Sequence, residues 1–62
     1  MTTALCGLRE ARHAAGLSQE ALAHKVGCST STIRIIEGGY RPSMEMSERI
    51  AAALGVDVLT IT

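Results

Sequence analysis

The sequence predicts an all-α fold, a compact bundle of four to five short helices. Glycine and serine residues divide the chain into short segments, as they do at helix ends. Within these segments apolar residues recur three and four positions apart. The core must be aliphatic, because the 62 residues include no Trp or Phe and only one Tyr. A chain of this length has room for one domain, which is expected to span residues 1–62.

The first predicted helix starts after Thr2 or Thr3 as N-cap and ends at Gly16. A glycine just beyond the last periodic residue is typical of a helix end. The residues that share one helical face are Leu5, Leu8, Ala11, Arg12 and Ala15.

Two further helices are predicted on either side of a glycine. The second helix follows Ser18 as N-cap and ends at Gly27, and the third starts after Ser29 and runs through Glu37. Their inward-facing residues are Leu22, Ala23 and Val26 in the second helix, and Ile33 and Ile36 in the third. Residues 19–38 thus have the pattern of a helix-turn-helix, a motif that places its second helix in the major groove of DNA.

The fourth predicted helix is capped by Ser43, carries Glu45 in its first turn and ends at Gly55. Its apolar stripe consists of Met46, Ile50, Ala53 and Leu54. For the tail, residues 57–62, the sequence leaves two alternatives open. Asp57 suits the cap of a one-turn helix, whereas the β-branched residues and their alternation suit a strand.

The formal net charge is zero, which argues against binding to nucleic acid. The charges are unevenly distributed, however: residues 1–42 are net positive and residues 43–62 net negative. Such a distribution can direct one face of the protein toward phosphates.

The same composition excludes several other classes of protein. No apolar run is long enough to cross a membrane, and the N-terminus lacks the pattern of a secretory signal, so a cytoplasmic protein is expected. Cys6 and Cys28 are expected to be reduced thiols. Together with His13 and His24 they lack the spacing of a structural zinc site, so no metal is predicted.

Three segments carry a family resemblance: LREARHAAGLSQEALA at residues 8–23, VGCSTSTIRIIEGG at 26–39, and RPS with IAAALGV between 41 and 56. With this pattern the chain resembles the Cro/repressor-type helix-turn-helix family over about 49 of its 62 residues. The resemblance implies a lambda-repressor-like DNA-binding domain whose members bind palindromic operators as dimers. Two features depart from the family: the loop before Pro42 is one residue shorter, and Ile35 replaces a polar residue.

The residues expected to contact bases lie at the start of the third helix and on its outward face. They are Thr30, Ser31, Arg34 and Ile35. Hydroxyl groups bond several base edges, arginine binds guanine, and an apolar side chain contacts a thymine methyl group. The alternatives are that the hydroxyl residues only cap the helix, that Arg34 is solvated, and that Ile35 packs in the core or an interface.

Other positions are expected to bind phosphate or to hold the bundle together. The phosphate candidates are Gln19, Arg9, Thr32 and Arg41. For Gln19 this role is implied by the family, and it agrees with the free N–H groups at a helix N-terminus. The family also implies a partly buried salt bridge between Arg12 and Glu37.

These observations predict a sequence-specific transcriptional regulator, a repressor that binds a palindromic operator in double-stranded DNA as a homodimer. The expected dimer interface is the apolar tail: Val56, Val58, Leu59 and Ile61. The alternative is a protein-interaction module of the same fold, antitoxin-like or a co-regulator, with little DNA binding of its own. An enzyme is the weakest hypothesis because no catalytic arrangement of residues is present. No cofactor, small-molecule ligand or membrane association is expected.

Overall fold

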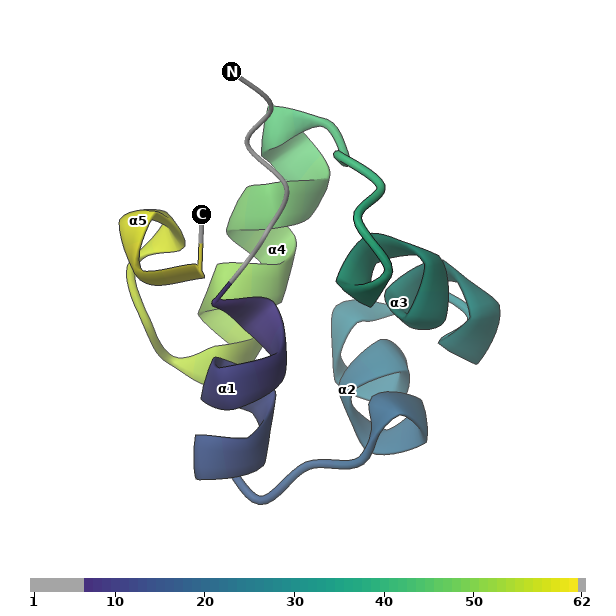
Figure 1. Cartoon of the computed structure of the whole chain (residues 1–62). Coiled ribbons are helices and arrows are strands. Elements are labelled where there is room, and N and C mark those ends of the chain that lie inside the picture. The colour runs from purple at the N-terminus through teal and green to yellow at the C-terminus, as the bar shows by residue number, and fades with distance from the viewer. Residues whose placement is uncertain (1–6, 62) are drawn as a thin grey trace.

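The computed structural model describes residues 7–61, and within that range all regular secondary structure is helical (Figure 1). The helices are α1 (Leu8–Ala14), α2 (Gln19–Val26), α3 (Thr30–Glu37), α4 (Met44–Leu54) and α5 (Val58–Ile61). The predicted all-α bundle is confirmed. The proposed caps Thr2 and Thr3, and also Leu5 and Cys6, lie outside the described residues. None of the helices in residues 7–61 has the length and apolar character needed to span a membrane.

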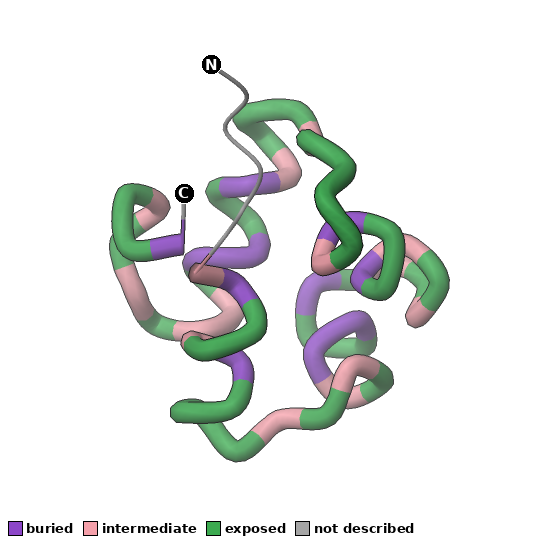
Figure 2. Tube along the Cα trace, in the orientation of Figure 1, coloured by how far each residue is buried: buried purple, intermediate pink, exposed green. Residues whose placement is uncertain are grey.

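Helix α4 is the central element of the bundle. It contacts α2 on one side and α5 on the other, while α1 contacts α5 and α2 packs against α3 (Figure 1). Figure 2 marks the buried residues along the chain, and the apolar ones form a single core cluster. They are Leu8, Leu22, Ala23, Val26, Ile33, Ile36, Ile50, Ala51 and Ile61.

Serine side chains begin three of the helices, as the sequence predicts. Each serine has an extended backbone, and its hydroxyl oxygen accepts a hydrogen bond from the third residue after it. The bonds are Ala21 N–H to Ser18 at 3.0 Å, Thr32 N–H to Ser29 at 3.2 Å and Met46 N–H to Ser43 at 3.2 Å. Each bond satisfies an N–H group that has no partner within its own helix.

The turn between α2 and α3 depends on a small residue and a glycine. Gly27 has a φ of 91°, a left-handed conformation that side chains disfavour. This turn lets the N–H groups of Gly27 and Cys28 donate to the carbonyl oxygen of Ala23, at 2.8 and 3.0 Å. Ala23 is 2% exposed, so a larger side chain there would have to displace its neighbours in the core.

The buried faces of α1 and α4 differ in detail from the predicted stripes. Ala15, predicted on the inner face of the first helix, is exposed because α1 ends just before it. In α4, Ser47 and Ala51 are buried on either side of Ile50, and the predicted residues Ala53 and Leu54 are half-buried. Ser47 fits inside because its hydroxyl donates to the carbonyl oxygen of Ser43, at 3.0 Å.

The tail forms a helix, so the strand alternative is wrong. The Oδ1 atom of Asp57 accepts a hydrogen bond from the N–H of Leu59 at 3.1 Å, and α5 returns to the start of α1. There the N–H of Gly7 donates to the carbonyl oxygen of Ile61 at 3.1 Å, and a Cβ on Gly7 would lie 2.6 Å from the Thr60 oxygen. The proposed dimer interface must therefore be corrected at Ile61. This side chain is 0% exposed and belongs to the core of its own chain.

Candidate nucleic-acid interface

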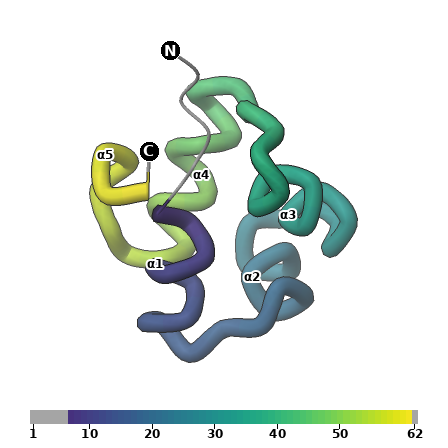
Figure 3. The backbone as a smooth tube through the Cα atoms, viewed as in Figure 1, coloured from purple at the N-terminus to yellow at the C-terminus, as the bar shows by residue number. Residues whose placement is uncertain are grey.

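Helices α2 and α3 follow one another on one side of the molecule (Figure 3), and Ser31, Arg34 and Ile35 of α3 are exposed. Ile33 and Ile36 hold α3 to the core, at 0% and 2% exposure. The hydroxyl groups of Ser29 and Thr32 lie 2.9 Å apart and form a hydrogen bond across the first turn of α3. The short helix is therefore fixed at its inner face and at its start.

The predicted base-contact residues lie together on the outward side of α3. Ser31, Arg34 and Ile35 are exposed, and Thr30, the first residue of the helix, is half-buried. Because residues four apart share a helix face, Thr30 lies beside Arg34 and Ser31 beside Ile35. The exposed fraction of Ile35 is 57%, so this apolar side chain is not part of the core.

Three of the four predicted phosphate-contact residues already have partners within the protein, and the fourth has none within residues 7–61. The side-chain amide of Gln19 donates to Glu37 Oε1 at 2.9 Å, and the Nε of Arg9 lies 3.6 Å from the same oxygen. The hydroxyl of Thr32 is bonded to that of Ser29 at the start of α3. Arg41, in the loop between α3 and α4, is exposed and has no hydrogen bond or ion pair within residues 7–61.

Glu37 at the end of α3 is the centre of a polar cluster. Its carboxylate accepts two hydrogen bonds from the Arg12 guanidinium, Nε to Oε2 at 2.6 Å and Nη2 to Oε1 at 3.2 Å. Arg12 also donates through Nη1 to the carbonyl oxygen of Leu17 at 3.0 Å. The side chains of Arg12 and Glu37 are 9% and 1% exposed, so the pair is shielded from solvent. Together with Gln19, the cluster joins α1, the start of α2 and the end of α3.

The environment of Glu37 stabilises its charged form. Burial raises the pKa of the carboxyl, but hydrogen bonds from Arg12 and Gln19 and the positive charges of Arg12 and Arg9 outweigh it. The pKa of Glu37 is therefore lowered from its ordinary value of 4.5.

Two contacts in this region were not predicted from the sequence. One is the bond from Gln19 to Glu37, which depends on how the start of α2 meets the end of α3. The other is the bond from Arg49 Nη2 to the carbonyl oxygen of Val26 at 2.8 Å, which joins α4 to the last turn of α2. Both join residues far apart in the sequence, so no local spacing indicates them.

The basic side chains differ in whether they have a partner. Within residues 7–61, Lys25, Arg34 and Arg41 have neither a hydrogen bond nor an ion pair. The other basic residues have partners: Arg9 and Arg12 pair with the Glu37 carboxylate, and Arg49 donates to the Val26 carbonyl oxygen. The described part of the chain contains no group of three or more His, Cys, Asp and Glu side chains that could hold a metal ion. Cys28 is a free, half-buried thiol.

The fold and the exposed third helix define a helix-turn-helix protein. The chain belongs to the helix-turn-helix family, since the model of that family matches residues 8–61. This agrees with the resemblance to Cro/repressor-type proteins seen in the sequence.

A relative in Methanothermobacter thermautotrophicus (strain Delta H) is described as an uncharacterized HTH-type transcriptional regulator. It is 49% identical over 49 residues, which cover 77% of this chain and 71% of the relative. No solved structure matches the chain.

Truncation of Arg12 is expected to destabilise the fold strongly, because Glu37 would remain as a buried charge without its main partner. The expected loss for Arg12→Ala is about 3–5 kcal/mol. A domain of this size has a free energy of unfolding of about 3–9 kcal/mol, so the loss should be at least about a third of the total. Urea titration monitored by circular dichroism measures the change.

The matched control is Arg9→Ala. The side chain of Arg9 is 63% exposed and 3.6 Å from the carboxylate, so a loss below about 1 kcal/mol is expected. Equal losses in the two variants would contradict the assignment of Arg12 as the principal partner.

Stability is expected to decrease in acid because of Glu37. A carboxyl whose pKa is lower in the folded state stabilises the fold at pH values above its unfolded pKa. This contribution is lost as the pH falls from about 4.5 through the lower folded pKa of Glu37. In Glu37→Gln, the slope of unfolding free energy against pH in this range should therefore be smaller.

The control is Glu48→Gln, which removes an exposed carboxyl that has no partner within residues 7–61. This variant should keep the wild-type slope. A Glu37→Gln variant with an unchanged slope would assign the acid sensitivity to other groups.

Proposed function

We propose that this chain is a transcriptional regulator that binds double-stranded DNA sequence-specifically through α3. The observation that carries the proposal is the outward face of α3, where Ser31, Arg34 and Ile35 are exposed on a helix anchored by Ile33 and Ile36. Membership in the helix-turn-helix family supports DNA binding, and the relative's description supports a role in transcription.

In the proposed complex, the N-terminal part of α3 lies in the major groove. Thr30 and Ser31 bond base edges, Arg34 binds a guanine or a phosphate, and Ile35 contacts an apolar base group. The start of α2 faces a phosphate with its free N–H groups. Since the Gln19 amide already bonds Glu37, its remaining N–H would contact the phosphate and the bond to Glu37 would orient it.

We further propose a repressor that binds a palindromic operator as a homodimer. A single α3 offers few groups for contact with bases, and two copies double that number. Half-sites about 34 Å apart would then be occupied on one face of the duplex. Of the proposed interface residues, Leu59 is 77% exposed and Val56 and Val58 are half-buried. Ile61 is omitted because it belongs to the core.

The function is tested by selecting bound fragments from random DNA and titrating salt. Each phosphate neutralised by a basic side chain contributes about 0.9 to the slope of log K against log salt. Arg41→Ala should lower this slope by about 0.9 and weaken selected and scrambled duplexes alike. Arg34→Ala should cost about 1–3 kcal/mol on the selected site and relax its sequence preference.

The scrambled duplex is the control for specificity. Binding that is equal on the selected and scrambled duplexes would exclude sequence-specific recognition. An absence of DNA binding at low salt would favour the protein-interaction module of the same fold.

The dimer is tested by Leu59→Lys, which places a charge on the proposed apolar interface. The variant should lower the molar mass measured by sedimentation equilibrium and weaken binding to a two-half-site duplex. Met44→Lys, at a residue 65% exposed near the start of α4, is the matched control and should leave both unchanged. A Leu59→Lys protein with wild-type mass would show that the interface lies elsewhere.

A further inference from the structure

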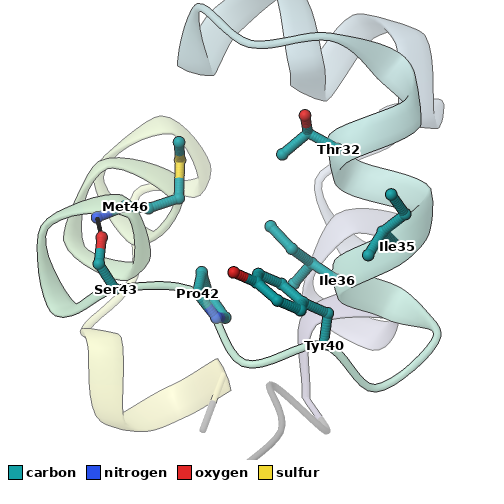
Figure 4. Close-up of a pocket in the computed structure, with 7 residues that line it drawn as sticks. All are labelled: Thr32, Ile35, Ile36, Tyr40, Pro42, Ser43 and Met46. Atoms are coloured by element: carbon teal, nitrogen blue, oxygen red, sulfur yellow. Dashed lines mark hydrogen bonds between the residues drawn. The ribbon is translucent and has the colours of Figure 1, made fainter.

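Helix α3 is not packed closely against the start of α4. An open hollow of about 460 Å³ lies between them (Figure 4). Among the residues that line it are Ile35 and Ile36 of α3, Tyr40 of the connecting loop and Met46 of α4. Because side chains do not fill this space, the direction of α3 depends on how its two ends are held.

Side chains of two different helices hold the two ends of α3. At its C-terminal end, Arg12 of α1 bonds Glu37. Before its N-terminal end, Arg49 of α4 reaches the turn that joins α2 to α3, where its Nη2 donates to the carbonyl oxygen of Val26 at 2.8 Å. Thr30, the first residue of α3, is about 10 Å along the helix from Glu37, so the ion pair with Arg12 does not restrain it directly.

The position of Arg49 suits it to hold this turn. Val26 is the last residue of α2, so its carbonyl oxygen has no N–H partner within that helix. A helix C-terminus also carries partial negative charge, which attracts a guanidinium. The same Nη2 atom would be 3.1 Å from a Cβ on Gly27, so the guanidinium lies against the turn itself. Arg49 precedes Ile50, which is 0% exposed, so the backbone that carries the guanidinium is anchored in the core.

On the premise that α3 binds DNA as proposed above, we infer that Arg49 is a positioning residue for sequence recognition. It acts through the carbonyl oxygen of Val26 and contacts no DNA itself. By holding the turn to α4, it fixes how the first turn of α3 enters the major groove, and hence which base edges Thr30 and Ser31 meet. Phosphate contacts carry no sequence information, whereas a bond to a base edge needs a defined distance and direction. Loss of the Arg49 bond should therefore lower specific binding more than non-specific binding.

The experiment compares Arg49→Met with Arg49→Lys on the selected and the scrambled duplex. Methionine has no donor, whereas the lysine ammonium can donate one hydrogen bond to the same carbonyl oxygen. Arg49→Met should weaken binding to the selected duplex about three- to tenfold, the range expected for loss of one hydrogen bond. Its affinity for the scrambled duplex and its slope of log K against log salt should stay close to the wild-type values. Arg49→Lys should restore most of the lost affinity.

Lys25→Met is the matched control, because it removes an exposed positive charge from the last turn of α2 that has no partner within residues 7–61. It should keep the wild-type ratio of selected to scrambled affinity. Amide hydrogen exchange provides a readout without DNA. The N–H groups of Gly27 and Cys28, which are hydrogen-bonded in the turn, should exchange faster in Arg49→Met than in Lys25→Met.

A salt slope lowered by about 0.9, with equal weakening on both duplexes, would make Arg49 a phosphate contact and overturn the inference. An unchanged affinity ratio in Arg49→Met, the same loss of ratio in Lys25→Met, or unchanged exchange at the turn would also overturn it and leave DNA binding intact. Circular dichroism confirms that these variants, changed at exposed residues, remain folded. If the wild-type chain selects no DNA, the proposed function fails and the inference fails with it.

Discussion

The ion pair between Arg12 and Glu37 is the constraint on which the arrangement of α3 depends. Helix α3 has eight residues, and its buried apolar residues are Ile33 and Ile36. With only two buried apolar side chains, a short helix could rotate about its own axis against the core unless another interaction prevents this. The paired hydrogen bonds from Arg12 at the C-terminal end and the Ser29 cap at the N-terminal end supply that restraint. Buried ion pairs contribute to a specific geometry more reliably than to net stability, and a helix that reads bases needs that geometry.

The same cluster connects the two proposed contact regions of the DNA interface. Gln19, at the start of α2, bonds the carboxylate that also orients the end of α3. A phosphate bound at the start of α2 would therefore be positioned relative to α3 through Glu37. Truncation of this carboxylate would alter two contact regions together, whereas truncation of Arg34 would alter one. The polar cluster and the exposed side chains thus have separate roles, and their variants should differ in stability and in affinity.

The parts of this structure that the sequence predicted are those that depend on neighbouring residues. A serine cap bonds an N–H three residues ahead, and the left-handed turn at Gly27 needs only the absence of a side chain, so both are visible in a single segment. The buried position of Ile61 depends on contact with the start of α1, some 50 residues away, and no periodicity in the tail indicates it. The bond from Gln19 to Glu37 and the hollow beside Tyr40 depend in the same way on how helices meet. The exposed positions of Ser31, Arg34 and Ile35 were predictable, because helix periodicity places them away from the buried residues Ile33 and Ile36.

The zero net charge of the chain does not argue against DNA binding when the positions of the charged side chains in the structure are considered. At physiological salt, exposed charges separated by more than about 8 Å are largely screened, and the described chain extends over 30 Å. The charges close to the proposed interface would therefore act most strongly on a duplex bound there. The one acidic residue of α3, Glu37, is 1% exposed and paired with Arg12, so it contributes little negative potential at the surface. Arg34 and Arg41 remain without partners within residues 7–61, so their positive charges are available to a duplex although the whole chain is neutral.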